Sequence, residues 1–316
     1  MPEKSSIDFL LFLGDFIYAD VPVFIGDDRA SYHRLYRRNY QSPSFRRVYE
    51  KLRKSRVCFV RPDSDAEVAI VHIYDDHEVI CLDSLTFFFH SQSSQFINDY
   101  AGNSLDVAPY VNGSAAYNIY AGNANYDPIQ PGQHYYTFRR GDVEFFVLDT
   151  RRFRSGVKNT EQDERTMLGE TQLTALHKWL IAVNSTSSFK FIVSSVPFTS
   201  LWSWGGQVDS WAGYPKEKAA LLETLHSVPN VIIISGDRHE FAVIEFNPPD
   251  PKHGHIVREI STSPLSMFYV PFFRTLRSQS DQTLTRNVTV AENVTAEVKV
   301  PYERTVAYLY KGNSKW

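Results

Sequence analysis

Short apolar segments alternate with amphipathic segments along the 316-residue chain. Two segments have helical character, because Leu and Val recur at helical spacing in Gly169–Val183 and Pro215 opens a similar segment at a position that a first helical turn tolerates. Alternating strands and helices predict an α/β fold. No repeat, heptad or Gly/Ser-rich linker divides the chain, so we expect a single domain over residues 1–316. The predicted strands, rich in β-branched and aromatic residues, are Ile7–Leu13, Glu144–Leu148, Lys190–Val196, Asn230–Ser235, Phe241–Phe246 and Ile256–Ser261.

Composition excludes several classes of protein. The 33 Lys and Arg residues against 36 Asp and Glu give a net charge of −3, which provides no basic surface for nucleic acid. Two cysteines cannot build a disulfide framework, and no apolar run approaches the roughly 20 residues that a membrane helix needs. The partner that remains is a small substrate, and the sequence leaves the oligomeric state open.

Four Asn-x-Ser/Thr sequons occur, at Asn112, Asn184, Asn287 and Asn293. About one or two would arise by chance in a chain of this length, so the number indicates a glycoprotein of the secretory pathway, either extracellular or membrane-anchored. The first residues run directly into the strand at Ile7 without an apolar signal region. We therefore expect that an upstream segment is missing from the chain.

Carboxylates and histidines follow predicted strands at three places. Gly14 and Asp15 end the first strand, and glycine permits a sharp turn that leaves the Asp15 carboxylate free to bridge cations, although Asp15 could instead cap a helix. Asp75, Asp76, His77 and Glu78 follow an apolar pair. These adjacent carboxylates repel one another unless cations or solvent neutralise them, and a histidine beside metal-bound carboxylates suits a general acid.

The third cluster, Ser235–Glu240, repeats the pattern of strand, glycine and Asp-x-His. Alternate residues of an extended segment point the same way, so Asp237 and His239 can address one metal ion. Arg151 follows another strand and is suited to bidentate recognition of a phosphate, with a surface salt bridge as the alternative. Oxygen and imidazole ligands without thiolates favour two-metal chemistry on a phosphoryl group, which predicts hydrolysis of a phosphate ester.

Six motifs follow one another along Asp8–Leu265: GDFIYAD from Gly14, DDHE from Asp75, LDTRRFRSG from Leu148, Asp209–Pro215, SGDRHEF from Ser235 and Glu259–Leu265. In this order they resemble the motifs of the PhoD-like alkaline phosphatases, a branch of the calcineurin-like metallophosphoesterases. Residues 19–24 and 37–52 resemble fungal members of this family. The resemblance implies an α/β/β/α sandwich of two mixed sheets flanked by helices, with phosphomonoesterase or phosphodiesterase activity at a centre of iron and calcium, other divalent metals being alternatives.

By the same resemblance, Asp15 is expected to bridge the metals and Tyr18 to bind the ferric ion as a phenolate. Asp76 is expected to bind the second metal, and His77 is expected to lie near the leaving group while a metal-bound hydroxide attacks phosphorus. Arg151 would hold the phosphate. The remaining expected metal ligands are Asn98, Asp237 and His239.

Two departures from the family pattern lead to a hypothesis about the gene. The family's cysteine ligand precedes the Gly-Asp motif, but only thirteen residues precede Gly14 and none is cysteine. The DDHE motif is interrupted after Val79, and excising Ile80–Phe96 would restore Asp-Asp-His-Glu-Val-Ile-Asn-Asp, which includes Asn98. We interpret residues 53–71 and 80–96, which contain both cysteines, as translated introns in a gene product that also lacks its first exon.

Two alternatives to a phosphomonoesterase stay open. A phosphodiesterase, similar to phospholipase D in activity, could use the same centre. From another class of protein, the chain could be a catalytically dead fragment that only binds calcium or phosphate, which the missing cysteine strand would favour.

Overall fold

In the computed structural model of the chain, the described residues are 9–19, 28–47, 69–78, 110–157, 160–238, 240–262, 275–291 and 294–309. They form two compact units, Met1–Asp127 and Pro128–Trp316, called here the first and the second unit. None of the helices in these ranges has the length and apolar character needed to cross a membrane.

The first unit is built on two parallel strands, β1 (Phe9–Leu13) and β2 (Ala69–Ile73), which pair in register from Phe9 and Ala69 onward. The short 3-10 helix η1 (Asp76–Glu78) follows β2. Helices α1 (Arg29–Gln41) and α4 (Tyr110–Tyr120) pack together, and the 3-10 turn η2 (Gly122–Ala124) follows α4. Because parallel neighbours end at the same edge, the turns after β1 and β2 adjoin.

Aromatic packing and a capping bond account for α1. The Asp28 carboxylate accepts a hydrogen bond from the backbone N–H of Ser31 at 3.0 Å, which satisfies a donor at the helix start. Tyr32 and Tyr36 lie on one helical face and are buried in the core of the first unit. The Tyr36 ring stacks on Tyr120 of α4 at 5.2 Å between ring centroids. The two helices therefore share an aromatic interface.

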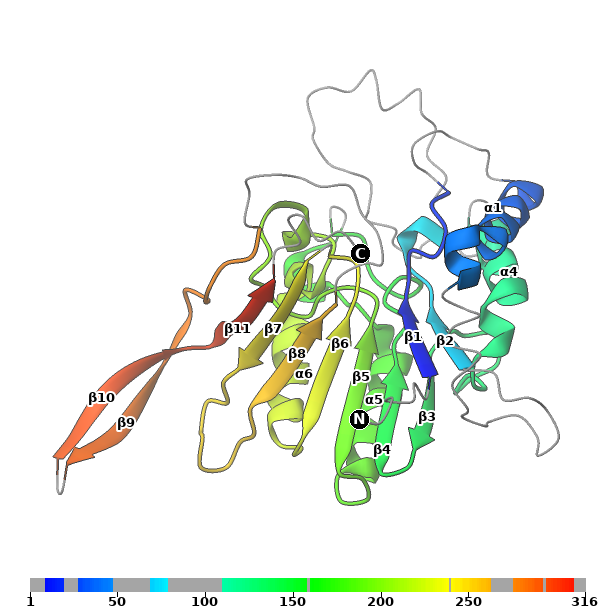
Figure 1. Cartoon of the computed structure of the whole chain (residues 1–316). Helices are drawn as coiled ribbons and strands as arrows, with labels where there is room; N and C mark the ends of the chain where they lie inside the picture. Colours follow the sequence, from blue (N-terminus) through cyan, green and yellow to red (C-terminus); the bar gives the residue numbers. More distant parts are fainter. Residues whose placement is uncertain are drawn as a thin grey trace, which may run out of the picture. The chain divides into compact units, whose positions relative to one another are not determined.

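A seven-stranded mixed sheet dominates the second unit, in the order β11-β7-β8-β6-β5-β4-β3 (Figure 1). Strands β4, β5, β6 and β8 run parallel, whereas β3, β7 and β11 are antiparallel to their neighbours. Antiparallel strands β9 (Thr283–Ala291) and β10 (Val294–Pro301) form a separate ribbon. The sheet strands are β3 (Tyr136–Arg140), β4 (Val143–Val147), β5 (Phe189–Ser194), β6 (Val231–Ser235), β7 (Phe241–Phe246), β8 (Val257–Ser261) and β11 (Glu303–Leu309).

Helices α5 (Gly169–Val183) and α6 (Pro215–His226) cover one face of this sheet (Figure 1). Their buried leucines, including Leu180 and Leu222, share a core with Phe146, Ile192 and Ile233 of the central strands. Short 3-10 turns lie at Gln162–Glu164 (η3), Trp204–Gln207 (η4) and Trp211–Gly213 (η5). The sheet thus provides the rigid base from which loops at the carboxyl ends of β4, β5 and β6 extend.

The predicted α/β fold class is confirmed, with a large mixed sheet flanked by helices. The predicted strands and both predicted helices are present, and the strand boundaries differ from the prediction by at most two residues where they are described. The structure adds α1, α4, β2, β3 and β9, which the sequence pattern did not indicate. Whether the chain forms a single domain stays a prediction.

The hypothesis of two inserts falls mostly outside the described residues. Residues 53–68 and 80–96 lie beyond them. Ala69–Val71, the end of the first expected insert, belong to β2 and pair with Phe9–Leu11. Excision through Val71 would therefore remove three of the five residues of β2.

Candidate metal centre

The turn that follows β1 has an unusual backbone. Gly14 adopts φ 98° and Asp15 adopts φ 54°, both in the left-handed region that side chains other than glycine disfavour. A Cβ atom at Gly14 would lie 2.5 Å from the Cβ of Asp75, in the turn after β2. Only glycine fits at this position, and the strained turn places Asp15 beside the acidic segment.

The Glu78 carboxylate joins the two turns. It accepts hydrogen bonds from the backbone N–H groups of Asp15 at 3.1 Å and Ile17 at 3.1 Å, and also from that of Phe16. It accepts a further one from its own turn, the N–H of Asp75 at 2.7 Å. Burial raises the pKa of Glu78 to about 8, although the hydrogen bond from Asp75 acts in the opposite direction. Glu78 therefore positions the backbone of the site and is not available as a free ligand.

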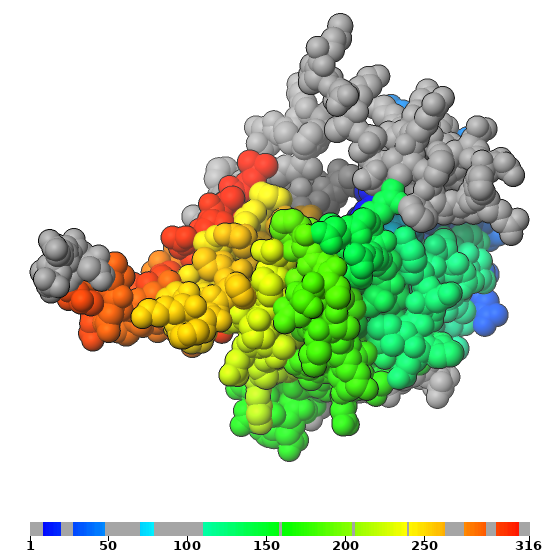
Figure 2. Space-filling view, turned by 90° about the horizontal axis from the view of Figure 1, so that it is seen from below, coloured from blue at the N-terminus to red at the C-terminus, as the bar shows by residue number. Residues whose placement is uncertain are grey.

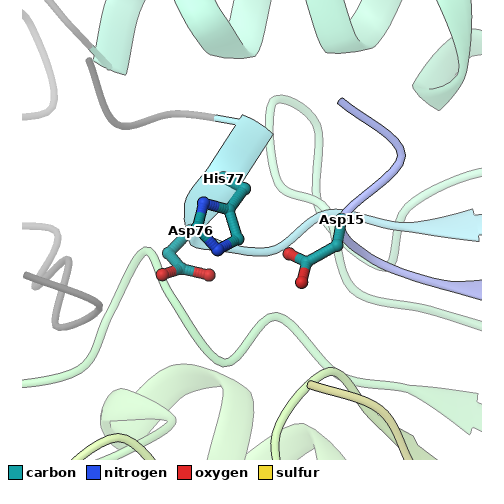
Figure 3. Close-up of side chains that lie close together, drawn as sticks. All are labelled: Asp15, Asp76 and His77. Atoms are coloured by element: carbon teal, nitrogen blue, oxygen red, sulfur yellow. The ribbon is translucent and has the colours of Figure 1, made fainter. Parts of the chain in front are cut away.

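Asp15, Asp76 and His77 come together at this edge of the first unit (Figure 3). One potential ligand atom from each lies within 4.8 Å of the others. The Tyr18 hydroxyl donates a hydrogen bond to Asp15 Oδ2 at 3.2 Å, and its ring lies 4.2 Å from the imidazole of His77, measured between ring centroids. Asp15, Tyr18, Asp76 and His77 are thus neighbours in the first unit.

The electrostatics of this group fit a bound cation. Burial, and then the charges of Asp75 and Asp76, raise the pKa of Asp15 well above its ordinary value. Asp15 Oδ1 is buried and accepts no hydrogen bond from any described residue. A divalent cation would neutralise the clustered carboxylates and occupy this free oxygen. Asp15 and Asp76 are suited to hold it, with Tyr18 or His77 as a further ligand.

In the second unit, Asp237 follows β6 through a similar turn. Gly236 donates its N–H to the carbonyl of Ser194 at the end of β5, and Asp237 adopts φ 65°. One carboxylate oxygen of Asp237 lies within 4.8 Å of one of Asp209. The guanidinium carbon of the next residue, Arg238, lies 5.2 Å from the centroid of the Trp202 ring.

Asp209 holds two buried arginines. Arg151 Nη1 donates to Asp209 Oδ1 at 2.6 Å and Nη2 to Oδ2 at 3.2 Å, while Arg154 Nη2 lies 2.7 Å from Oδ1. Arg151 and Arg154 are both almost completely excluded from solvent. Burial alone would raise the pKa of Asp209, but the two arginines outweigh it and hold that pKa below its ordinary value. Of the alternatives for Arg151, the structure shows a buried ion pair in place of a surface one.

Two buried side chains fix the loops that carry these groups. Gln172 of α5 accepts the Asp149 N–H at 2.8 Å and donates to the Asp149 carbonyl at 2.8 Å, which anchors the turn before Arg151. Glu259 of β8 accepts the N–H groups of Phe198 and Thr199, each at 2.8 Å. The loops after β4 and β5 are therefore held by polar contacts to neighbouring elements.

The predicted ligand set is divided between the two units. Asp15, Tyr18, Asp76 and His77 are grouped in the first, and Arg151 and Asp237 lie in the second. Asn98 and His239 fall outside the described residues, so their roles stay predictions. Sequence reasoning assigned no role to Asp209, although it lies in a quoted motif, and none to Glu78 as a backbone acceptor.

The chain is similar to known phosphatases. The sequence profile of the PhoD-like phosphatase family matches residues 1–304. No curated protein is significantly similar to the chain. The solved structure of PhoD has 20% identity and a TM-score of 0.57, covering 82% of this chain and 52% of PhoD.

Two further solved structures are more distant. A dimetal phosphatase from Danio rerio has 15% identity and a TM-score of 0.34, with 62% of this chain and 61% of that one covered. The purple acid phosphatase PPD1 from yellow lupin (Lupinus luteus) seeds has 12% identity and a TM-score of 0.44, with coverages of 91% and 50%. The match accounts for half to three fifths of the length of each of these three proteins.

Proposed function

The chain belongs to the PhoD-like phosphatase family, and from this premise we propose that it catalyses metal-dependent hydrolysis of phosphate esters. The observation that supports this most directly is the group of Asp15, Asp76 and His77, with ligand atoms within 4.8 Å and a buried Asp15 oxygen that accepts no hydrogen bond from the described residues. Such a group is costly without a cation and is typical of a hydrolytic metal site.

Asp15 and Asp76 are the proposed residues that hold the cations. When bound, such ions supply a polarised phosphoryl oxygen and an activated water. Asp237, His239 and Asn98 stay predicted metal ligands. The His77 ring, packed against Tyr18, is proposed to donate a proton to the leaving oxygen of the ester.

Arg151 is proposed to bind the phosphate through a guanidinium whose position Asp209 fixes. Because the guanidinium is excluded from solvent and both Nη groups donate to Asp209, phosphate binding requires Arg151 to exchange part of this contact for the anion. Asp209 also partly neutralises the charges of Arg151 and Arg154, and this weakens their attraction for an anion.

The central experiment measures metal content and hydrolysis on the same purified chain, with p-nitrophenyl phosphate and bis-p-nitrophenyl phosphate as substrates. We expect bound metal, hydrolysis that a chelator abolishes, and loss of both in Asp15→Asn. Asp142→Asn is the matched control, because Asp142 is exposed and pairs loosely with Arg139 at 3.8 Å.

Each outcome of this experiment has a meaning. Faster turnover of the diester would assign a phosphodiesterase, and faster turnover of the monoester a phosphomonoesterase. Stoichiometric metal without hydrolysis would support the alternative that the chain only binds metal or phosphate. Chelator-resistant hydrolysis, or full activity in Asp15→Asn, would overturn the proposal.

Iron together with calcium is the proposed metal content. Hard carboxylate oxygens suit calcium, and the Tyr18 hydroxyl, 3.2 Å from Asp15 Oδ2, is placed to bind a ferric ion as a phenolate. A ferric phenolate absorbs visible light, so Tyr18→Phe should abolish a visible absorption band of the iron-loaded chain. A band that persists in Tyr18→Phe would contradict this assignment.

We also propose that the chain is a glycoprotein of the secretory pathway. Asn184 and Asn287 are exposed, as a glycosylation acceptor must be. Digestion of protein from a eukaryotic secretory host with an endoglycosidase should increase its electrophoretic mobility, and this shift should become smaller in Asn287→Gln. Identical mobility before and after digestion would count against the proposal.

A further inference from the structure

A cavity lies at the end of the large sheet where β5 and β6 begin, which is the opposite end of β6 from Asp237. It has a volume of about 360 Å³ and is lined where β5 and β6 begin and by the connection between β7 and β8. Asn230 precedes β6 and Asp237 follows it, so five strand residues, about 16 Å, separate the two ends. Figure 2, the view from below, faces this end of the strands, with the β7–β8 connection in yellow to orange.

Two arginines line the cavity, and none of its described lining residues is acidic. Arg258 is paired with Glu245, whose carboxylate lies 3.0 Å from Arg258 Nη2 and also accepts from Arg304 Nη2 at 2.9 Å. Glu245 is thus shared between two cations. The lining therefore keeps a positive charge that the neighbouring carboxylate does not fully offset.

Arg286 of β9 is the second cation, and its partners are neutral. Its Nη2 donates to the Pro248 carbonyl at 3.2 Å and to Asn247 Oδ1 at 3.5 Å. Its Nε is buried and donates to no acceptor among the described residues. The contacts printed for this guanidinium are to neutral groups, so its charge is not offset there and attracts an anion in the cavity that Arg286 lines.

Part of the remaining wall is apolar. Phe189 at the start of β5 and Ile256 just before β8 are 45% and 40% exposed, and with Ile232 and Pro248 they border the space next to the arginines. An inorganic anion alone would leave this apolar surface in water. A ligand that carries an apolar body as well as an anionic group would cover both parts of the lining.

We propose that this cavity binds a small organic anion, with Arg286 and Arg258 contacting its charged group and Phe189 and Ile256 contacting its apolar body. This site lies at the opposite end of β6 from Asp237 and needs no metal. Its size lies within the range of small-molecule pockets, roughly 300–1,000 Å³.

The test uses naphthalene-2-sulfonate as the anionic probe and 2-naphthalenemethanol as its uncharged counterpart, with isothermal titration calorimetry on the full chain. We expect one sulfonate per chain, and binding of the alcohol weaker by about tenfold or more. Arg286→Gln should weaken sulfonate binding by a similar factor. Arg304→Gln is the matched control, because Arg304 contacts the same Glu245 but does not line the cavity.

A second variant guards against misfolding of Arg286→Gln. Ile256→Asp places a negative charge on a partly exposed cavity wall, so it should fold and also weaken sulfonate binding. Both variants should hydrolyse p-nitrophenyl phosphate at the wild-type rate. Equal binding of sulfonate and alcohol, undiminished binding in both variants, equal weakening in Arg304→Gln, or no sulfonate binding to the wild-type chain would each overturn the proposal.

Discussion

Asp209 and Arg151 form a bidentate ion pair, with contacts of 2.6 and 3.2 Å, that is almost completely shielded from solvent. The same carboxylate holds Arg154 at 2.7 Å, so one negative charge serves two buried cations. Removing one member of a buried ion pair usually costs more than the pair itself contributes, because the remaining charge stays buried. The pair therefore gives a specific expectation for a single substitution.

We expect Asp209→Asn to lower the free energy of unfolding by about 3–5 kcal/mol, because Arg151 and Arg154 lose their counter-charge. Urea unfolding followed by tryptophan fluorescence measures the change. Asp281→Asn is the control, since Asp281 pairs with Arg277 while 96% exposed and should change stability by about 1 kcal/mol or less. Equal losses in the two variants would show that the buried pair is unimportant for stability.

Gly14→Ala should disrupt the first unit at the candidate metal site. The new Cβ would lie 2.5 Å from the Cβ of Asp75, in addition to the strain of a φ of 98°. Gly141→Ala is a matched control, because Gly141 also has a positive φ, 59°, but a Cβ there would meet nothing within 4 Å.

The difference between these two variants isolates the steric clash. We expect Gly14→Ala to cost about 1–3 kcal/mol more than Gly141→Ala, in keeping with the usual cost of overpacking. Urea unfolding followed by circular dichroism gives this difference, and metal content should fall only in Gly14→Ala. Indistinguishable stabilities would mean that the two turns are not in the close contact described.

The parts of the site that the sequence predicts are those with a local signal. Asp15 and Asp237 each follow an apolar strand and a glycine, and both adopt the positive φ that such a turn requires. Strand and helix periodicity is likewise local, which is why helix Gly169–Val183 is predicted with its observed bounds. Tyr32, Leu35 and Tyr36 of α1 have the same helical spacing, so the sequence carries a local signal for this helix too.

The parts that escaped prediction depend on contacts between residues far apart in the chain. In the sequence Glu78 is one member of an acidic run. In the structure it accepts hydrogen bonds from backbone N–H groups 61 to 63 positions away. Asp209 meets Arg151 across 58 positions. No periodicity encodes such pairs, because only the folded sheet brings their loops together.

Stability should depend on pH through His72 of β2. Burial lowers the pKa of His72 from 6.5 to about 4, and its ring packs against Phe12 and Phe16. The unfolded chain therefore binds the proton more tightly than the folded chain. The contribution to stability is complete above pH 6.5 and is lost as the pH falls toward 4, at a slope approaching about 1.4 kcal/mol per pH unit.

Urea unfolding of His72→Phe between pH 4 and pH 7, followed by circular dichroism, tests this dependence. We expect the variant to lose part of the wild-type slope. His253→Gln is the control, because the side chain of His253 is 83% exposed, so its substitution should change the slope less than His72→Phe does. Parallel curves for wild type and His72→Phe would refute the assignment to His72.

The ion pair between Lys218 of α6 and Glu303 of β11, at 2.6 Å, should couple the helix to the edge of the sheet. Both side chains are buried, and Glu303 also accepts hydrogen bonds from the Thr199 hydroxyl at 2.7 Å and the Ser200 N–H at 2.8 Å. Burial alone would raise the pKa of Glu303, but Lys218 outweighs it and holds that pKa below its ordinary value. Lys218→Met would therefore leave a buried carboxylate without its cation.

A double-mutant cycle with Lys218→Met and Glu303→Gln measures this coupling. We expect Lys218→Met alone to cost about 3–5 kcal/mol, and the double variant to cost less than the sum of the single variants by about 1–3 kcal/mol. The same cycle on Arg139 and Asp142, an exposed pair 3.8 Å apart, should give a much smaller coupling, because solvent screens the two charges. If the losses from the two single variants are additive, the coupling energy between Lys218 and Glu303 is zero. That result would show that apolar packing alone holds α6 against β11, because two interacting buried charges give non-additive losses.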